Sequence, residues 1–86
     1  MLRLWAKTIK DQKITQGYIY ESIDNFSADT FYLHVANICH KMDIATPVVL
    51  KTHVQNLVTF NNVTFLPRDF VESVNFDKFT IEDASL

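Results

Sequence analysis

Apolar and polar side chains alternate over residues 2–9, and this alternation restricts the fold more than any other feature of the chain. Successive side chains of a β-strand point to opposite faces of a sheet, so the pattern predicts a strand with one face on a core. The two faces are Leu2, Leu4 and Ala6 on one side and Arg3, Trp5 and Lys7 on the other. We therefore expect a sheet that packs on a hydrophobic core.

A second strand is expected directly after the first. Residues 10–13 are polar and of turn length, and residues 14–23 are rich in β-branched and aromatic side chains, so the pair is typical of a β-hairpin. Gly17, the single glycine of the chain, predicts a bulge or a close backbone approach within this strand. Tyr18 and Tyr20 share one of its faces.

The first of two expected helices begins at Ser27. Serine is a favourable N-cap, and Phe26 and Phe31 have the spacing of a hydrophobic staple. Apolar residues then recur at helical spacing and form one stripe, which consists of Phe31, Val35, Ile38 and Met42. Leu33 lies roughly opposite this stripe, where it could contact a second surface.

The second expected helix begins at Thr46, because a threonine N-cap is followed by Pro47 at the first helical position, where proline is favoured. Its apolar face is formed by Leu50, Val54, Leu57 and Val58. The pair Asn61 and Asn62 ends the pattern with residues that tolerate turns.

The last third of the chain predicts a short strand at residues 63–66 and a turn or one helical turn at 67–71. The apolar residues of 74–82 change parity, so either Asp77 and Lys78 form a turn or the strand is bulged, and we expect a bulged last strand at 74–82 that pairs with the hairpin. A chain of 86 residues has room for one small core. We therefore expect residues 1–86 to form a single α+β domain. Its N-terminal β-hairpin and C-terminal strand complete a small antiparallel sheet, on which two amphipathic helices pack.

Composition favours a folded protein of the cytoplasm. The chain carries seven Phe, three Tyr and one Trp, which disordered chains lack. Cys39 is the only cysteine, which excludes an intramolecular disulfide and points to a reducing compartment. No apolar run is long enough for a membrane span, and charge interrupts the start too early for a signal peptide.

Charge is distributed unevenly between the two ends of the chain. Residues 1–13 hold four basic and one acidic side chain, a net charge of +3, whereas residues 68–86 hold two basic and five acidic ones, a net charge of −3. Terminal segments of opposite sign can lie side by side in one sheet, where opposed charges help modestly. The alternative is that the basic end docks on nucleic acid or on the acidic end of another chain.

No catalytic, cofactor-binding or metal-ligating residue is predicted, and we do not expect an enzyme. The side chains that could bind zinc are His34, Cys39, His40 and His53. The three of them on the first expected helix, His34, Cys39 and His40, lack the i, i+3 or i, i+4 spacing that would bring them together. Cys39 as a nucleophile would need a nearby histidine base, and a core position explains it better. His53 is interpreted as a half-buried side chain bonded to a backbone carbonyl. One isolated glycine cannot form a phosphate-binding loop.

The best candidate for a functional surface is therefore the hairpin, where Trp5 lies between two cations and the two tyrosines are candidates to join it. Aromatic and basic side chains on a sheet suit single-stranded bases, and the same residue types are enriched at protein interfaces. A third alternative is that both sheet faces are covered and no site exists. The residues of the expected interaction surface are Arg3, Trp5, Lys7, Tyr18, Tyr20 and Leu33.

Three segments, at residues 38–47 (ICHKMDIATP), 65–72 (FLPRDFVE) and 79–82 (FTIE), resemble short uncharacterised single-domain proteins of Gram-positive bacteria. The resemblance implies a bacterial cytoplasmic protein and carries over no functional residue. We expect a small non-enzymatic interaction module that binds a protein partner or associates with itself as a homodimer. The alternative is weak binding of single-stranded nucleic acid through Arg3, Trp5, Lys7, Lys10, Lys13 and Tyr18.

Overall fold

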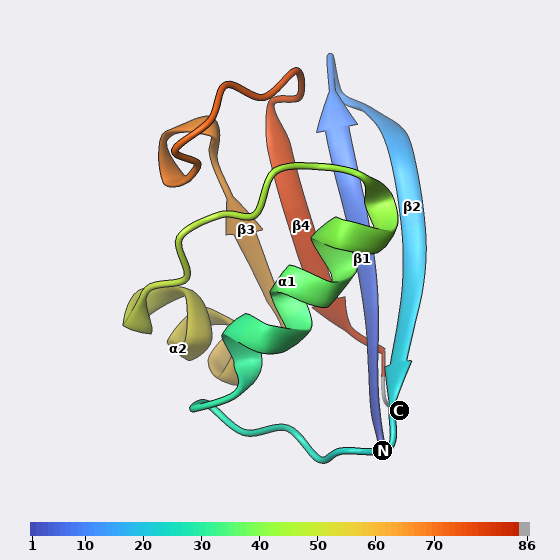
Figure 1. The fold of residues 1–86 in the computed structure, drawn as a ribbon, viewed down its shortest axis with the longest axis vertical. Helices are drawn as coiled ribbons and strands as arrows, with labels where there is room; N and C mark the ends of the chain where they lie inside the picture. The colour runs from blue at the N-terminus through green and yellow to red at the C-terminus, as the bar shows by residue number, and fades with distance from the viewer. Residues whose placement is uncertain (85–86) are drawn as a thin grey trace.

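A computed structural model describes residues 1–84 and places four antiparallel strands in one sheet with two helices in front of it (Figure 1). The strand order is β2-β1-β4-β3. The expected α+β architecture, with its N-terminal hairpin and C-terminal strand, is confirmed. The strands are β1 (Leu2–Lys10), β2 (Lys13–Ser22), β3 (Asn62–Phe65) and β4 (Lys78–Asp83).

The basic first strand and the acidic last strand lie side by side in the centre of the sheet. β1 pairs antiparallel with β4, so Trp5 lies opposite Glu82 and Ile9 lies opposite Lys78. The two terminal segments of opposite sign are thus neighbours in one sheet, although the register pairs no basic residue of β1 directly with an acidic residue of β4.

Helix α1 (Phe31–Met42) carries the expected apolar stripe and buries it against the sheet. Its predicted start at Ser27 was wrong. The Ser27 carbonyl accepts a hydrogen bond from the Thr30 N–H at 3.2 Å in a turn that precedes the helix. The Phe26 and Phe31 rings nevertheless contact each other, with centroids 5.9 Å apart, so the two residues expected to form a staple do meet.

Helix α2 (Lys51–Phe60) begins later than predicted. Residues 44–50 form no regular secondary structure instead. The Val48 N–H donates to the Asp69 carbonyl at 2.8 Å and so ties this segment to the 3₁₀ turn η1 (Pro67–Asp69). The buried residues of α2 are His53 and Leu57, whereas Val58 is 62% exposed. The helix lies near the short strand β3. Of the predicted apolar face, Leu57 is buried and Val54 packs partly buried against the core, whereas the prediction was wrong for Leu50 and Val58, which are exposed.

Two details of the strands also differ from the prediction. The bulge of β2 does not lie at Gly17: the β1–β2 register shifts between Thr8 and Ile9, which leaves Thr15 as the extra residue. The last strand starts only at Lys78, after a bend at residues 75–77, so the alternative of a turn replaces the predicted bulged strand. This bend is what allows Phe76 and Phe79 both to be buried.

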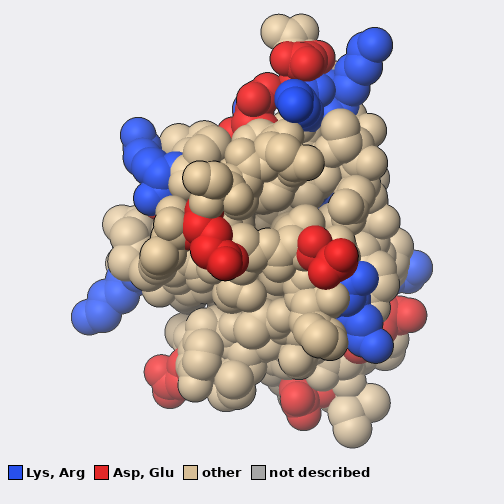
Figure 2. All heavy atoms as spheres, turned by 45° about the horizontal axis from the view of Figure 1, so that its top comes forward, with Lys and Arg blue, Asp and Glu red and all other residues tan. Residues whose placement is uncertain are grey.

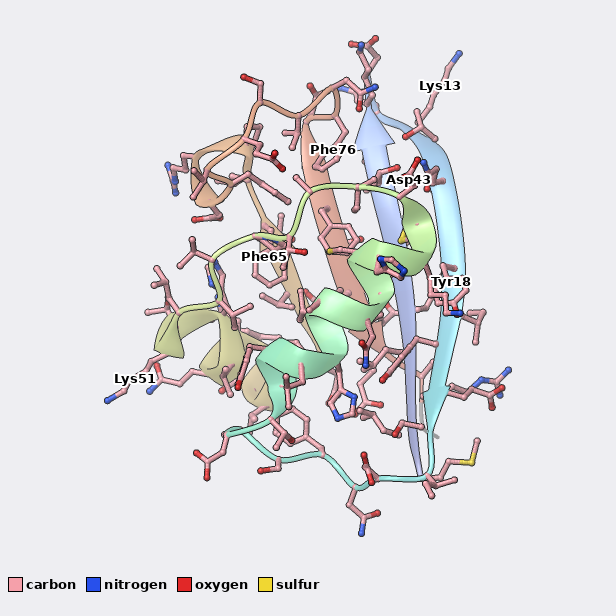
Figure 3. The ribbon with its side chains drawn as sticks, in the orientation of Figure 1. Lys13, Tyr18, Asp43, Lys51, Phe65 and Phe76 are labelled. Carbon is pink, nitrogen blue, oxygen red and sulfur yellow. The ribbon has the colours of Figure 1, made fainter. Side chains whose placement is uncertain are left out.

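The core lies between the sheet and the two helices. Phe65 stacks on Phe79 with ring centroids 5.9 Å apart, and Phe76 contacts both Phe79 and Phe70. Phe65 and Phe76 both lie on the side of the sheet that faces the helices and the segment that joins them (Figure 3). Full burial of one such side chain stabilises the fold by about 1.5–3 kcal/mol. Five of the seven phenylalanines are therefore core.

Candidate interaction surface

The helices cover one face of the sheet only, and the side chains of the other face are partly or fully exposed. Burial alternates residue by residue along β1, β3 and β4, as it must when a sheet packs on one side. We call the uncovered side the open face. Its residues are Arg3, Trp5, Lys7 and Ile9 of β1, Ile14, Gly17, Ile19 and Glu21 of β2, Asn62 and Thr64 of β3, and Lys78, Thr80 and Glu82 of β4.

Trp5 lies near the middle of the open face and leans along the sheet. Its indole Nε1 is 3.7 Å from the point where a Cβ on Gly17 would be, so the glycine leaves the indole room beside the neighbouring strand. The Lys7 Nζ lies 3.9 Å from the centroid of the Trp5 ring, a cation–π contact that stabilises an exposed pair by about 0.5–1 kcal/mol. Trp5 and Lys7 therefore lie together on one face, as predicted.

The side chains of the open face form three rows across the strands, because directly paired residues share a face. The first row contains Ile19, Trp5, Glu82 and Asn62. The middle row contains Gly17, Lys7, Thr80 and Thr64. The third row contains Ile14, Ile9 and Lys78. Arg3 and Glu21 lie beyond the first row, with Nε and Oε2 4.0 Å apart.

Tyr18 and Tyr20 do not belong to this surface, which corrects the sequence-based expectation. They pair with Ala6 and Leu4, so they lie on the helix side of the sheet and pack against the core. The Tyr20 hydroxyl forms a hydrogen bond with Nδ1 of His34 at 2.8 Å. Alternation within β2 placed the two tyrosines on one face, but the register with β1 decides which face that is.

Leu33 is 48% exposed on α1 and is separated from Trp5 by the sheet. It lines a hollow of about 460 Å³ between α1 and the end of β2. The lining residues are Tyr20, Ser22, Asp24, Thr30, Leu33, His34 and Asn37. The sequence analysis missed the Tyr20–His34 contact, since no motif joins residues fourteen positions apart. The only signal was that His34 borders the apolar stripe of the helix.

Cys39 is a buried thiol and cannot act as a nucleophile near neutral pH. Burial raises its pKa from the ordinary value of 9.0 to about 12, although a hydrogen bond with the Thr46 side chain opposes the shift. Thiolate is the reactive form, so the side chain is inert. The interpretation of Cys39 as a small core residue therefore explains its position.

His53 has a structural role different from the one expected. Its Nδ1 accepts a hydrogen bond from the Leu50 N–H at 2.9 Å, rather than bonding to a backbone carbonyl. Its Nε2 lies 3.5 Å from Oδ2 of Asp69, which also accepts from the Leu66 N–H at 2.9 Å. The pair thus fastens the start of α2 to η1.

Within residues 1–84 no group of three or more His, Cys, Asp or Glu side chains is arranged to hold a metal ion. Neither helix of this part of the chain is long and apolar enough to cross a membrane. Comparison with known proteins finds no matching family model, no matching curated protein and no matching solved structure. The resemblance to proteins of Gram-positive bacteria stays a prediction.

Proposed function

We propose that this domain is a non-enzymatic interaction module that binds protein through its open face, and that its partner is a second copy of the chain. The observation that carries the proposal is the group of four apolar side chains, Trp5, Ile9, Ile14 and Ile19, on a sheet face that no helix covers. Tryptophan is among the residues that contribute most to protein interfaces, especially near the centre of a contact.

The charges of the open face favour a protein partner over nucleic acid. Glu21 and Glu82 lie among its basic residues, and Glu21 is close to Arg3. Carboxylates on a surface repel phosphates, and stacking would depend on Trp5 alone because both β-hairpin tyrosines face the helices. Away from the open face, basic and acidic groups are also interspersed on the surface drawn in Figure 2, and no broad basic area is visible there.

A second copy suits the size of the domain and of the surface. Small cores stabilise a fold only marginally, and binding of the folded state adds stability by mass action. Four strands at their usual spacing and three rows of side chains cover roughly 400 Å² of flat sheet, less than the ~800 Å² per partner of a standard stable interface. We therefore expect a reversible dimer in the micromolar range, in the bacterial cytoplasm that the lone cysteine and the resemblance suggest.

Sedimentation equilibrium from 5 to 500 µM tests the proposal. The wild-type chain is expected to pass from monomer to dimer over this range, and Trp5→Ala to stay monomeric. Tyr32→Ala is the matched control, because Tyr32 is an aromatic residue 56% exposed on α1, away from the open face. A wild-type chain that remains monomeric at 500 µM contradicts the proposal. Salt-dependent binding of a labelled oligonucleotide that Trp5→Ala abolishes would replace it with the nucleic-acid alternative.

A further inference from the structure

We infer that two copies stack their open faces about a two-fold axis that runs across the strands at the middle row, so that the strands of the two sheets run in opposite directions. The inference rests on the proposed function and gives it a geometry. The reason is the order of the side chains in the three rows. Rotation about this axis places side chains of complementary chemistry opposite each other, whereas rotation about an axis along the strands does not.

The axis across the strands places the first row of one copy over the third row of the other. Each strand then lies over the same strand of the second copy, reversed in direction. Trp5 meets Ile9 of the second copy, Ile19 meets its Ile14, and Glu82 meets its Lys78. Every apolar residue of the outer rows thus contacts an apolar residue, and the carboxylate contacts an ammonium group. Each of these contacts occurs twice because of the symmetry.

The charges exclude the other stacking of the same faces. An axis along the strands would place β4 of one copy over β1 of the other, so that Glu82 would lie on Trp5 and Lys78 on Ile9. Both charged groups would then be desolvated against apolar side chains without an opposite charge, which costs far more than the contact returns. Only the arrangement with reversed strands places Glu82 opposite Lys78.

The middle row lies on the axis and is shaped for close approach. Gly17, Thr80 and Thr64 are small, so the row is lower than the rows beside it. The Trp5 indole leans toward Gly17, into this low area. The Lys7 ammonium group lies over its own Trp5 ring, which takes it out of the path of Lys7 of the second copy. Each indole would therefore lie beside the axis, between the middle row and Ile9 of the second copy, in a contact between sheets about 10 Å apart.

Charge-reversal variants test this geometry. Glu82→Lys places like charges opposite each other at two symmetric points, and Lys78→Glu does the same with the opposite sign. Each single variant is expected to dimerise at least tenfold more weakly than the wild-type chain in sedimentation equilibrium, because like charges across an interface suppress association. The double variant Glu82→Lys/Lys78→Glu is expected to recover wild-type affinity.

An equimolar mixture of the two single variants is the sharpest form of the test. In a heterodimer of these chains all the reversed pairs become attractive again, so the mixture is expected to dimerise at concentrations where each chain alone, with its at least tenfold weaker association, stays monomeric. Glu72→Lys is the matched control, since Glu72 is exposed, lies outside the open face and changes the net charge equally. It should leave the dissociation constant within twofold of wild type.

The outcomes separate the geometry from the function. If the wild-type chain dimerises and Trp5→Ala does not, but both single charge variants dimerise like wild type, the two-fold geometry is wrong and the proposed function stands. Failure of the mixture to form heterodimers, with both single variants weakened, also overturns the geometry. A monomeric wild-type chain overturns both. Far-ultraviolet circular dichroism of each variant verifies that the domain is folded, which exposed strand positions allow.

Discussion

The Tyr20 hydroxyl and Nδ1 of His34 lie 2.8 Å apart and join the edge strand β2 to the first turn of α1. His34 is 5% exposed, so the nitrogen is largely removed from water and depends on the hydroxyl as its partner. A polar group left without a hydrogen bond in such a place costs about 1–3 kcal/mol. The contact therefore contributes to the position of the strand that carries Gly17 and Ile19 of the open face.

Tyr20→Phe is expected to lower the free energy of unfolding by about 1 kcal/mol, because it removes the hydroxyl and leaves the ring in place. Urea denaturation followed by circular dichroism measures the change. Tyr18→Phe is the control, since Tyr18 lies on the same face of β2 and is also partly buried. Equal destabilisation by the two substitutions would show that the Tyr20–His34 hydrogen bond does not contribute to the free energy of unfolding.

The sequence predicted the class of the fold because its strongest signals are periodic. Alternation over residues 2–9 and the stripe from Phe31 to Met42 each bury one continuous face, and both are confirmed. The start of α2 was missed because Thr46 and Pro47 form a favourable local signal that a distant hydrogen bond, from Val48 to Asp69, overrides. Local propensity is weak against such tertiary contacts.

The candidate site was predicted in part, for a related reason. Parity within β1 is enough to place Trp5 and Lys7 together, and the structure has them in contact. Parity within β2 cannot say which face Tyr18 shares, because that depends on the register of the hairpin and on the extra residue in it. A change of one residue in the register would have exchanged the tyrosines for Ile19 on the core side.

Because Cys39 is buried, the stability of the domain is expected to depend on pH. Its pKa rises from 9.0 in the unfolded chain to about 12 in the folded one, so the folded state disfavours the thiolate. The stability that the neutral thiol provides is fully present below pH 9 and is lost as the pH rises toward 12, because the unfolded chain releases a proton that the folded chain retains. The loss from this group is at most about 1.4 kcal/mol per pH unit.

Urea unfolding at pH 8, 9 and 10 measures the effect, and Cys39→Ala is the control that lacks the thiol. The difference in stability between wild type and this variant should shrink as the pH rises. At pH 8 the native thiol is also expected to react with a disulfide reagent at least a hundredfold more slowly than in urea, since the side chain is buried. Rapid labelling of the native chain would refute the assignment.

Thr80→Val is expected to stabilise the domain by about 0.5–1 kcal/mol. The Thr80 hydroxyl is buried and has no hydrogen-bond partner among residues 1–84, so its removal relieves a desolvated polar atom, and valine has nearly the same shape and a high strand propensity. Urea denaturation measures the change. Thr64→Val, at the directly opposite and exposed position of β3, is the control and should have a smaller effect. A destabilised Thr80→Val would mean that the hydroxyl has a partner in solution.

Trp5 is the only tryptophan, so its fluorescence reports on the open face alone. If the face is covered by a second copy, the emission maximum should shift to shorter wavelength between 5 and 500 µM, and quenching by acrylamide should fall by at least twofold, because the indole leaves water. The Glu82→Lys variant provides the control: its emission should shift only at concentrations at least tenfold higher than those at which the wild-type emission shifts. A wild-type spectrum that does not change with concentration, in a chain that sedimentation shows to be dimeric, would place the contact elsewhere on the molecule. The unpaired outer edge of β2 would then be the surface to test, because an exposed edge strand is the other part of a sheet that a second copy can cover.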